Sequence, residues 1–270
     1  MTTAKILDGK ALAEQMRLKI KKEIDATGIK PGLAAILVGD NEASRLYISR
    51  KEKAAIETGI IFSKYLCNSE CYPFIDEYEL LEMITFLNHD PAINGIIVQL
   101  PLPKDFDQDK IIKAIDPAKD VDGFNGGKII PPTISAVIGL LKSTEEKLDD
   151  KKTLVIGKSD IFTKGLENYL STELKLKKIK ISPAIPANCN DYDIVIIALG
   201  QAHALKKEQV KLGAIIIDIG INKLNAQTVG DVDPAVTEIA GYLSPVPGGV
   251  GPLTVACLLR NTLSLAQQWN

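Results

Sequence analysis

The stretch GLAAILVGDNEASRLYISRK, residues 32–51, decides the fold class because it passes from one hydrophobic period to another. The apolar run LAAILV, bounded by glycines, is typical of a buried strand. Ser44, Tyr47 and Lys51 then recur three and four residues apart, which predicts one stripe of a helix. A helix that follows a strand of an open parallel sheet starts at the edge where ligands bind. Spacing alone favours a solvated helix face, so the stripe needs support from other segments.

The segments around this stretch continue the alternation of strands and helices. An apolar helical face precedes it, and a short strand near IIFSKYLC, an apolar helix and the strand INGIIVQL follow. The pattern predicts a parallel sheet covered by helices. The apolar positions of the two helices are Leu12, Met16, Ile20 and Ile24, then Leu80, Ile84 and Leu87.

The second half of the chain predicts another sheet. After the Asp-, Gly- and Pro-rich stretch at 116–132, a helix through Val137, Leu140 and Leu141 leads to the four apolar runs TLVIG, KIKI, DIVIIALG and AIIIDIGIN. Turn-like or helical segments separate these runs, which predicts a second, smaller doubly wound sheet. The chain closes with a turn-rich loop, PVPGGVGP, and an amphipathic helix that tolerates Pro252 in its first turn.

Composition and charge exclude several classes of protein. The net charge is −2 and the basic residues are dispersed, so no surface for nucleic acid is expected. The apolar runs are too short to cross a bilayer and the first residues do not resemble a signal peptide, so we expect a cytoplasmic protein. Four scattered cysteines indicate reduced thiols. Cys67 and Cys71 have no second ligand pair at metal spacing, so we expect no metal site.

Three further stretches carry candidate site residues. VQLPLP places Gln99 at the end of a strand, where an amide can orient a neighbouring group. KDVDGF offers Asp120 and Asp122, of which one is expected to face a ligand and the other to serve a turn. PVPGGVGP gives a rigid approach followed by backbone without side chains, suited to a flat ligand at Pro247, Gly248 and Gly249.

These motifs together resemble one enzyme family. SxxYxxxK, VQLPLP, KDVDGF, DIGIN, VGDVD and PVPGGVGP occur in the same order in the bifunctional methylenetetrahydrofolate dehydrogenase/methenyltetrahydrofolate cyclohydrolase family. The resemblance implies an α/β fold of two doubly wound domains, the second Rossmann-like, with a cleft between them and a C-terminal helix returning to the first. It further implies a folate-binding catalytic domain at 1-120 plus 250-270 and a dinucleotide-binding domain at 121-249.

The resemblance also implies roles for individual residues. Lys51, Gln99 and Tyr47 match the catalytic positions, and Tyr47 would also stack on the folate, whose pterin edge Asp122 would bind. Pro247, Gly248 and Gly249 would line the substrate. A methenyl cation beside Lys51 would lower the pKa of its amine and favour the neutral form that removes a proton from water. The expected cofactor is NADP and the expected assembly is a homodimer.

The cofactor loop departs from the family pattern. In GKSDIFTKG, residues 157–165, Gly157 and Ser159 match, whereas Lys158 replaces an arginine and Thr163 replaces a glycine. The expected cofactor-binding residues are Gly157, Lys158, Ser159 and Ile221. A lysine lacks the guanidinium fork, and a side chain at Thr163 is expected to obstruct a pyrophosphate. NADP, NAD or no cofactor therefore stay open, as do a cyclohydrolase with weakened or lost dehydrogenase activity and a non-catalytic folate-binding paralogue.

Overall fold

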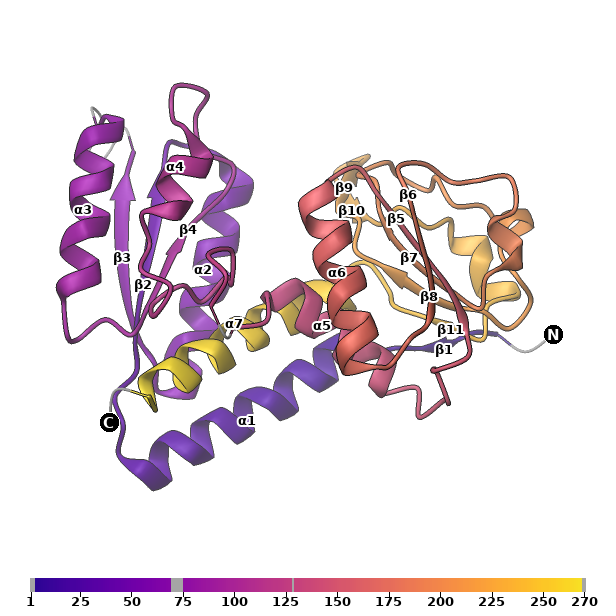
Figure 1. Ribbon diagram of the computed structural model, residues 1–270, viewed down its shortest axis with the longest axis horizontal. Helices are drawn as coiled ribbons and strands as arrows, with labels where there is room; N and C mark the ends of the chain where they lie inside the picture. The colour runs from indigo at the N-terminus through magenta and orange to yellow at the C-terminus, as the bar shows by residue number, and fades with distance from the viewer. Residues whose placement is uncertain (1–2, 69–74, 128, 269–270) are drawn as a thin grey trace. The chain divides into compact units, whose positions relative to one another are not determined.

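The computed structural model describes residues 3–68, 75–127 and 129–268, which form two compact units (Figure 1). The six-stranded unit consists of Met1–Leu12 and Thr133–Thr254, and the three-stranded unit of Ala13–Pro132 and Val255–Asn270. Each unit therefore combines distant parts of the sequence. Helices α1 (Gly9–Thr27) and α7 (Val250–Ala266) each begin in the six-stranded unit and end in the three-stranded unit.

The three-stranded unit is a parallel sheet in the order β3-β2-β4 with helices on both faces. Besides α1 and α7, its elements are β2 (Gly32–Val38), α2 (Glu42–Thr58), β3 (Ile61–Cys67), α3 (Glu77–His89), β4 (Gly95–Val98) and α4 (Gln108–Lys113). Every residue of β2 is buried, which explains its unbroken apolar sequence. The sheet is thus doubly wound, as the alternation of periods predicts.

Alternate residues of β2 pack into two separate cores of this unit. Leu33, Ala35 and Leu37 contact apolar side chains of α1, α2 and α7, including Leu258 and Leu263. The opposite face packs against α3 and α4. The C-terminal helix therefore returns to the sheet formed by the first third of the chain, as expected.

The six-stranded unit is an all-parallel sheet in the order β1-β11-β8-β7-β5-β6. Its strands are β1 (Lys5–Ile6), β5 (Lys152–Gly157), β6 (Lys178–Ser182), β7 (Ile194–Ala198), β8 (Ile215–Asp218) and β11 (Tyr242–Leu243). Helices α5 (Pro132–Lys142) and α6 (Asp160–Glu173) and the hairpin β9 (Asn222–Leu224) with β10 (Gln227–Val229) complete its main elements. The expectation that the second sheet is the smaller is wrong, because its strands β5, β6, β7 and β8 already outnumber the three of the other sheet and β1 and β11 widen it to six.

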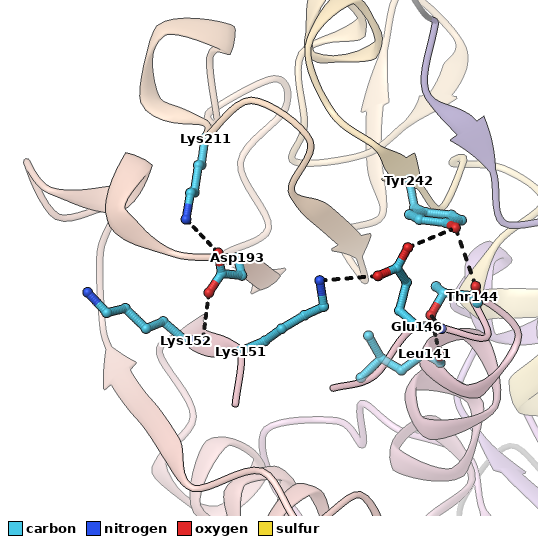
Figure 2. Close-up of polar contacts among 8 residues, drawn as sticks. All are labelled: Leu141, Thr144, Glu146, Lys151, Lys152, Asp193, Lys211 and Tyr242. Carbon is cyan, nitrogen blue, oxygen red and sulfur yellow. Dashed lines mark hydrogen bonds and ion pairs between the residues drawn. The ribbon is translucent and has the colours of Figure 1, made fainter. Parts of the chain in front are cut away.

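The amino ends of these strands are held by ion pairs and polar contacts, as Figure 2 shows. Asp193, just before β7, accepts hydrogen bonds from Lys211 Nζ at 2.6 Å and from the backbone N of Lys152 at 2.8 Å. Glu146 lies 3.4 Å from Lys151 Nζ and accepts a hydrogen bond from the Tyr242 hydroxyl at 3.4 Å. This edge is therefore occupied by contacts within the chain.

The strand order reverses at β2 in one sheet and at β5 in the other, and this positions the candidate sites. The chain runs from β2 outward to β3 and then returns to β4 on the other side of β2. It likewise runs from β5 to β6 and returns to β7 on the other side of β5. Ligands of open α/β sheets bind beyond the carboxyl ends of the strands at such a reversal. The ends of β2 and β4, and of β5 and β7, are therefore the places to look.

The length and apolar character of the helices bear on whether they could cross a membrane. In the ranges 3–68, 75–127 and 129–268, no helix combines the length and the apolar character that crossing a bilayer requires.

Candidate active site

Lys51 and Gln99 meet at the strand reversal of the three-stranded unit. Lys51 projects from α2, which follows β2, and its Nζ donates a hydrogen bond to Gln99 Oε1 at 2.9 Å. Gln99 directly follows β4, where its backbone N donates to Ile36 O at 2.9 Å and its Nε2 donates to Leu100 O at 2.8 Å. The amide is thus fixed at both ends of its side chain and holds the amine in one direction.

The charges around Lys51 place its titration under the control of burial and of Asp122. Burial lowers the pKa of the Lys51 amine, and the Asp122 carboxylate opposes this by raising it. Burial likewise raises the pKa of Asp122, against the ammonium of Lys51, and Asp120 adds to the rise. Both groups are therefore drawn toward their neutral forms, which suits a lysine that must accept a proton.

Asp120 and Asp122 have different surroundings, as the sequence predicts for one aspartate facing a ligand and one serving a turn. Asp120 is 2% exposed, and its two carboxylate oxygens accept hydrogen bonds from the backbone N–H groups of Asp122, Gly123 and Asn125. Asp122 is half-buried and influences Lys51. Asp120 therefore shapes the turn that presents Asp122.

Tyr47 lies one turn before Lys51 on α2 and is half-buried. Asn41 caps this helix by accepting a hydrogen bond from Ser44 N at 3.0 Å, which fixes the start of the stripe. Ser44 is itself buried, so of the three stripe residues only Tyr47 and Lys51 offer surface to a ligand.

The Gly157–Ser159 loop follows β5 at the strand reversal of the six-stranded unit. Lys158 is exposed, and Ser159 caps α6 by accepting a hydrogen bond from Phe162 N at 3.3 Å. The N-terminus of a helix and a nearby cation form a setting that favours phosphate. Ile221, the fourth expected cofactor residue, is 53% exposed beyond β8.

The expectation that Thr163 obstructs this loop is wrong. Thr163 is 1% exposed, and its Oγ1 donates to Ser159 O at 3.0 Å. Its Cγ2 lies 3.0 Å from the position that a β-carbon on Gly157 would take. The threonine thus packs beneath the loop, where it cannot reach a ligand at the surface.

Two buried aspartates organise the loops beside this reversal. Asp231 accepts hydrogen bonds from the backbone N–H groups of Leu199, Gly200 and Gln201, which follow β7. Asp218 accepts hydrogen bonds from the backbone N–H groups of Gly220, Asp231 and Val232. Burial raises the pKa of Asp218 to about 6, against these three donors. The DIGIN and VGDVD motifs therefore form one polar network beneath the exposed loop ends.

The glycines of PVPGGVGP have a cause within the six-stranded unit. A β-carbon on Gly249 would lie 2.7 Å from Pro245 O, and Gly249 O itself lies 1.9 Å from the β-carbon position of Gly9. Pro247 is exposed and follows a cis peptide bond, and Gly248 adopts a φ of +117°. Close backbone packing therefore explains Gly249, while Pro247 stays available to a ligand.

Cysteines show no organised site in the described part of the chain. Cys67, Cys189 and Cys257 are free and buried, whereas Cys71 lies outside the described residues. Burial raises the pKa of all three thiols, to about 11 for Cys67 and Cys189 and about 12 for Cys257. In the same ranges no cluster of His, Cys, Asp or Glu side chains is arranged to hold a metal ion.

Comparison with known families decides what this geometry belongs to. Residues 7–122 match the catalytic domain of tetrahydrofolate dehydrogenase/cyclohydrolase, and residues 131–270 match the NAD(P)-binding domain of the same enzymes. The chain belongs to this family. The tetrahydrofolate dehydrogenase/cyclohydrolase family resemblance read from the six motifs is confirmed, and so are the α/β fold and the Rossmann-like second sheet.

Individual relatives agree over nearly the whole chain. The Bifunctional protein FolD of Listeria innocua is 41% identical over 280 residues, covering 97% of both chains, and that of Cereibacter sphaeroides is 40% identical over 97% of this chain and 94% of the relative. The FolD crystal structure from Campylobacter jejuni has a TM-score of 0.90 at 36% identity, covering 98% and 99% of the two chains. The Trypanosoma brucei FolD structure, in complex with NADP and an inhibitor, has a TM-score of 0.89 at 30% identity, covering 99% of each chain.

Sequence reasoning missed several polar residues that support the tetrahydrofolate dehydrogenase/cyclohydrolase site. Asp218 and Asp231 lie inside recognised motifs, yet their binding of backbone N–H groups between distant loops has no periodic signal. Lys119 is 1% exposed and donates to Leu87 O in the last turn of α3 and to Asp90 O just after it. Lys119 lies next to a residue that pairs with an apolar strand, and this position was the available signal that the lysine is buried.

Proposed function

We propose that this chain oxidises 5,10-methylenetetrahydrofolate to 5,10-methenyltetrahydrofolate with NADP and then hydrolyses the product to 10-formyltetrahydrofolate. The observation that carries the proposal is the hydrogen bond from Lys51 to Gln99 at the ligand-binding edge of the three-stranded sheet. A lysine held by a neutral amide keeps its proton-accepting capacity, whereas an ion pair with a carboxylate would favour the charged form.

The hydrolysis needs a base near the methenyl carbon. Water adds to that carbon, forming a C–O bond, while the neutral amine of Lys51 takes one of its protons. The bond from the carbon to N5 then breaks as N5 takes the proton from the Lys51 ammonium, the hydroxyl of the adduct loses its proton to solvent and becomes the formyl C=O, and the formyl group stays on N10. Gln99 Oε1 accepts one N–H of the amine and so directs the lone pair, while Asp122 would bind the pterin edge and Tyr47 would stack on it. Pro247, Gly248 and Gly249 complete the proposed folate contacts.

The oxidation depends on residues of the six-stranded unit. When bound, NADP supplies the acceptor for the hydride. The exposed Lys158 and the N-terminus of α6 fit a phosphate, and Gly157, Ser159 and Ile221 flank the same strand reversal. We assign dinucleotide binding to the domain at 121-249, apart from the folate contacts Asp122 and Pro247, Gly248 and Gly249, and the rest of folate binding to the domain at 1-120 plus 250-270. Titrating the protein with NADP and with NAD separately tests this assignment, and binding of neither would contradict it.

The decisive experiment compares Lys51→Met with Lys53→Met. Lys53 is exposed on the same helix and serves as a matched control. Loss of a positioned general base lowers rates by about 10²–10⁴-fold. We expect Lys51→Met to lose hydrolysis of 5,10-methenyltetrahydrofolate by at least about 100-fold while it unfolds as cooperatively as Lys53→Met. Hydrolysis by Lys51→Met at the wild-type rate would refute the role of Lys51.

The assembly is proposed on the family resemblance, and the location on the apolar runs and first residues of the sequence. We infer a homodimer in the cytoplasm. Sedimentation equilibrium should give twice the mass of one chain, and a monomer at micromolar concentration would contradict the dimer. Fractionation of cells that express the protein at native level should place it with cytoplasmic markers.

A further inference from the structure

We infer that Asn261, on the C-terminal helix α7, is a positioning residue for the cyclohydrolase reaction and sets the place of Asp122. The inference rests on the proposed function, because it concerns the base and the carboxylate of that reaction. Asn261 itself is no part of the matched motifs and is 131 or more residues away from the groups that it binds.

Asn261 joins the two arms of the loop that carries Asp122. Its Nδ2 donates to Val121 O at 3.0 Å and to Ile130 O at 3.1 Å. A side-chain amide has two N–H donors, and both are used here. Asn261 is 9% exposed, so these bonds are protected from competing water. Val121 O belongs to the peptide that enters Asp122, so this bond fixes the direction in which the Asp122 side chain leaves the backbone.

Close packing under the loop makes the attachment rigid. Val121 is fully buried, and a β-carbon on Gly95 of β4 would lie 2.5 Å from Val121 Cγ1 and 3.5 Å from Thr262 Cγ2. Strand β4, the loop and α7 therefore meet at one place. Gln99 directly follows β4, so the same packing supports the partner of Lys51.

Other side-chain hydrogen bonds among the described residues hold the loop at different points. Asp120 binds N–H groups inside the turn, and Lys119 binds carbonyls at the C-terminal end of α3. Asn125 Nδ2 donates to Ile112 O and Ile115 O at the end of α4. These bonds shape the turn and its outer side. Asn261 connects its two ends to each other.

The consequence for chemistry runs through Asp122 and Lys51. The Asp122 carboxylate raises the pKa of Lys51 against the effect of burial. If the loop loses its attachment, Asp122 moves relative to Lys51 and to the substrate. Both the affinity for the folate and the pH at which Lys51 becomes neutral should then change together, which loss of stability alone would not produce.

The test compares Asn261→Leu, which removes both donors at similar volume, with Arg260→Met. Arg260 is adjacent on α7 but forms a two-bond ion pair with Glu23, at 2.6 and 2.9 Å, away from the loop. We expect Asn261→Leu to raise the KM for 5,10-methenyltetrahydrofolate at least 5-fold and to shift the pH–rate profile. Arg260→Met should leave both unchanged. Equal effects of the two variants, or wild-type KM and profile in Asn261→Leu, would overturn the inference.

A double-variant cycle and a measurement without substrate complete the test. In the Asp122→Asn background Asn261→Leu should alter KM by less than 2-fold, because its effect passes through Asp122; effects that multiply would overturn the inference. The pH at which an amine reagent modifies Lys51 can be followed by mass spectrometry. This pH should shift in Asn261→Leu and not in Arg260→Met. If Asn261→Leu shifts this pH although the wild-type protein has no hydrolase activity, Asn261 does position Asp122 and the proposed function is refuted. Should Asn261→Leu not fold, Asn261→Ser is held to the same outcomes.

Discussion

The loop that carries Asp122 and the loop that follows β5 are held in different ways. Side chains from outside the turn, including Asn261 and Lys119, attach the first loop to α7 and to the C-terminal end of α3. The second loop is held by its own helix, through Ser159 on Phe162 N and Thr163 on Ser159 O. Proton transfer needs side-chain atoms fixed within hydrogen-bonding reach, whereas phosphate can be bound by backbone N–H groups and a flexible cation. The second loop should therefore tolerate substitution better than the first.

The largest loss of stability should come from removing the Asp120 carboxylate, around which the first loop is organised. Asp120→Ala leaves three backbone N–H groups without their buried charged acceptor, and we expect a loss of about 3 kcal/mol in the free energy of unfolding. Ser159→Ala, which removes only a helix cap, should cost about 1 kcal/mol. Urea unfolding of both variants measures this difference. Equal losses would mean that the two loops are not held differently.

Asp122→Asn should weaken substrate binding without a comparable loss of stability. Hydrogen bonds to a charged group contribute about 1.5–3 kcal/mol, so the KM for the methenyl substrate should rise about 10- to 100-fold. Since the carboxylate raises the pKa of Lys51, the acid limb of the pH–rate profile should also move to lower pH. Asp105→Asn, an exposed change in the same unit, is the control. An unchanged KM would show that Asp122 does not contact the substrate.

The network under the cofactor loops should give a pH dependence of the opposite sign to an ordinary ion pair. The folded-state pKa of Asp218 is about 6, above its usual value of 3.8. The destabilisation caused by the buried, ionised carboxylate of Asp218 is therefore complete above pH 6. It is relieved as pH falls through 6 toward 3.8. The free energy of unfolding, relative to Asp218→Asn, should rise by about 1 kcal/mol from pH 7 to pH 5. A flat difference curve would contradict the raised pKa.

Asp193, at the amino end of the same sheet, provides the contrast. Burial raises the pKa of its carboxyl, but the hydrogen bonds from Lys211 and from the Lys152 backbone N outweigh this and lower it. Its stabilisation is present above the ordinary pKa of 3.8 and is lost as pH falls through the lower folded value. Relative to Asp193→Asn, stability should therefore fall on acidification.

The smallest effect concerns Thr163. Because its side chain is buried against Gly157, Thr163→Gly should cost about 1 kcal/mol of stability through lost packing and helix propensity. NADP affinity should stay within about 2-fold of the wild type, whereas Lys158→Ala should weaken it in a manner that depends on salt. Titrations at two ionic strengths measure both. Stronger NADP binding by Thr163→Gly would restore the idea that the threonine obstructs the phosphate.

Elements and residues with a local signal were predictable from the sequence. The seven-residue apolar run of β2 and the polar stripe of α2 have clear periods, so the strand and the helix follow from them, whereas the pairing of Lys51 with Gln99 was expected from the family resemblance. Strands β1 and β11 have two residues each, too few to show any period. Their pairing joins Lys5 to Tyr242, so the width of the second sheet depends on contacts that no local pattern records.

Site residues that act through the backbone were harder to predict. Thr163 occupies a position where the family pattern is expected to have glycine, and position in a motif says nothing of whether a side chain faces inward. Asn261 interrupts an apolar helix at a buried position, which indicates a hydrogen-bonding role, but its partners are fixed only by the fold. The sequence therefore located the chemistry better than the scaffold that holds it.

The division of each unit between distant segments has a consequence for synthesis on the ribosome. The three-stranded unit needs residues 255–270, and the six-stranded unit needs both its first strand and Tyr242–Leu243. Folding of N-terminal domains ahead of C-terminal ones during translation therefore cannot be completed here. Until α7 emerges, the core that contains Leu33, Ala35 and Leu37 lacks Leu258, Leu259 and Leu263. A nascent chain stalled before α7 would present this apolar surface to chaperones.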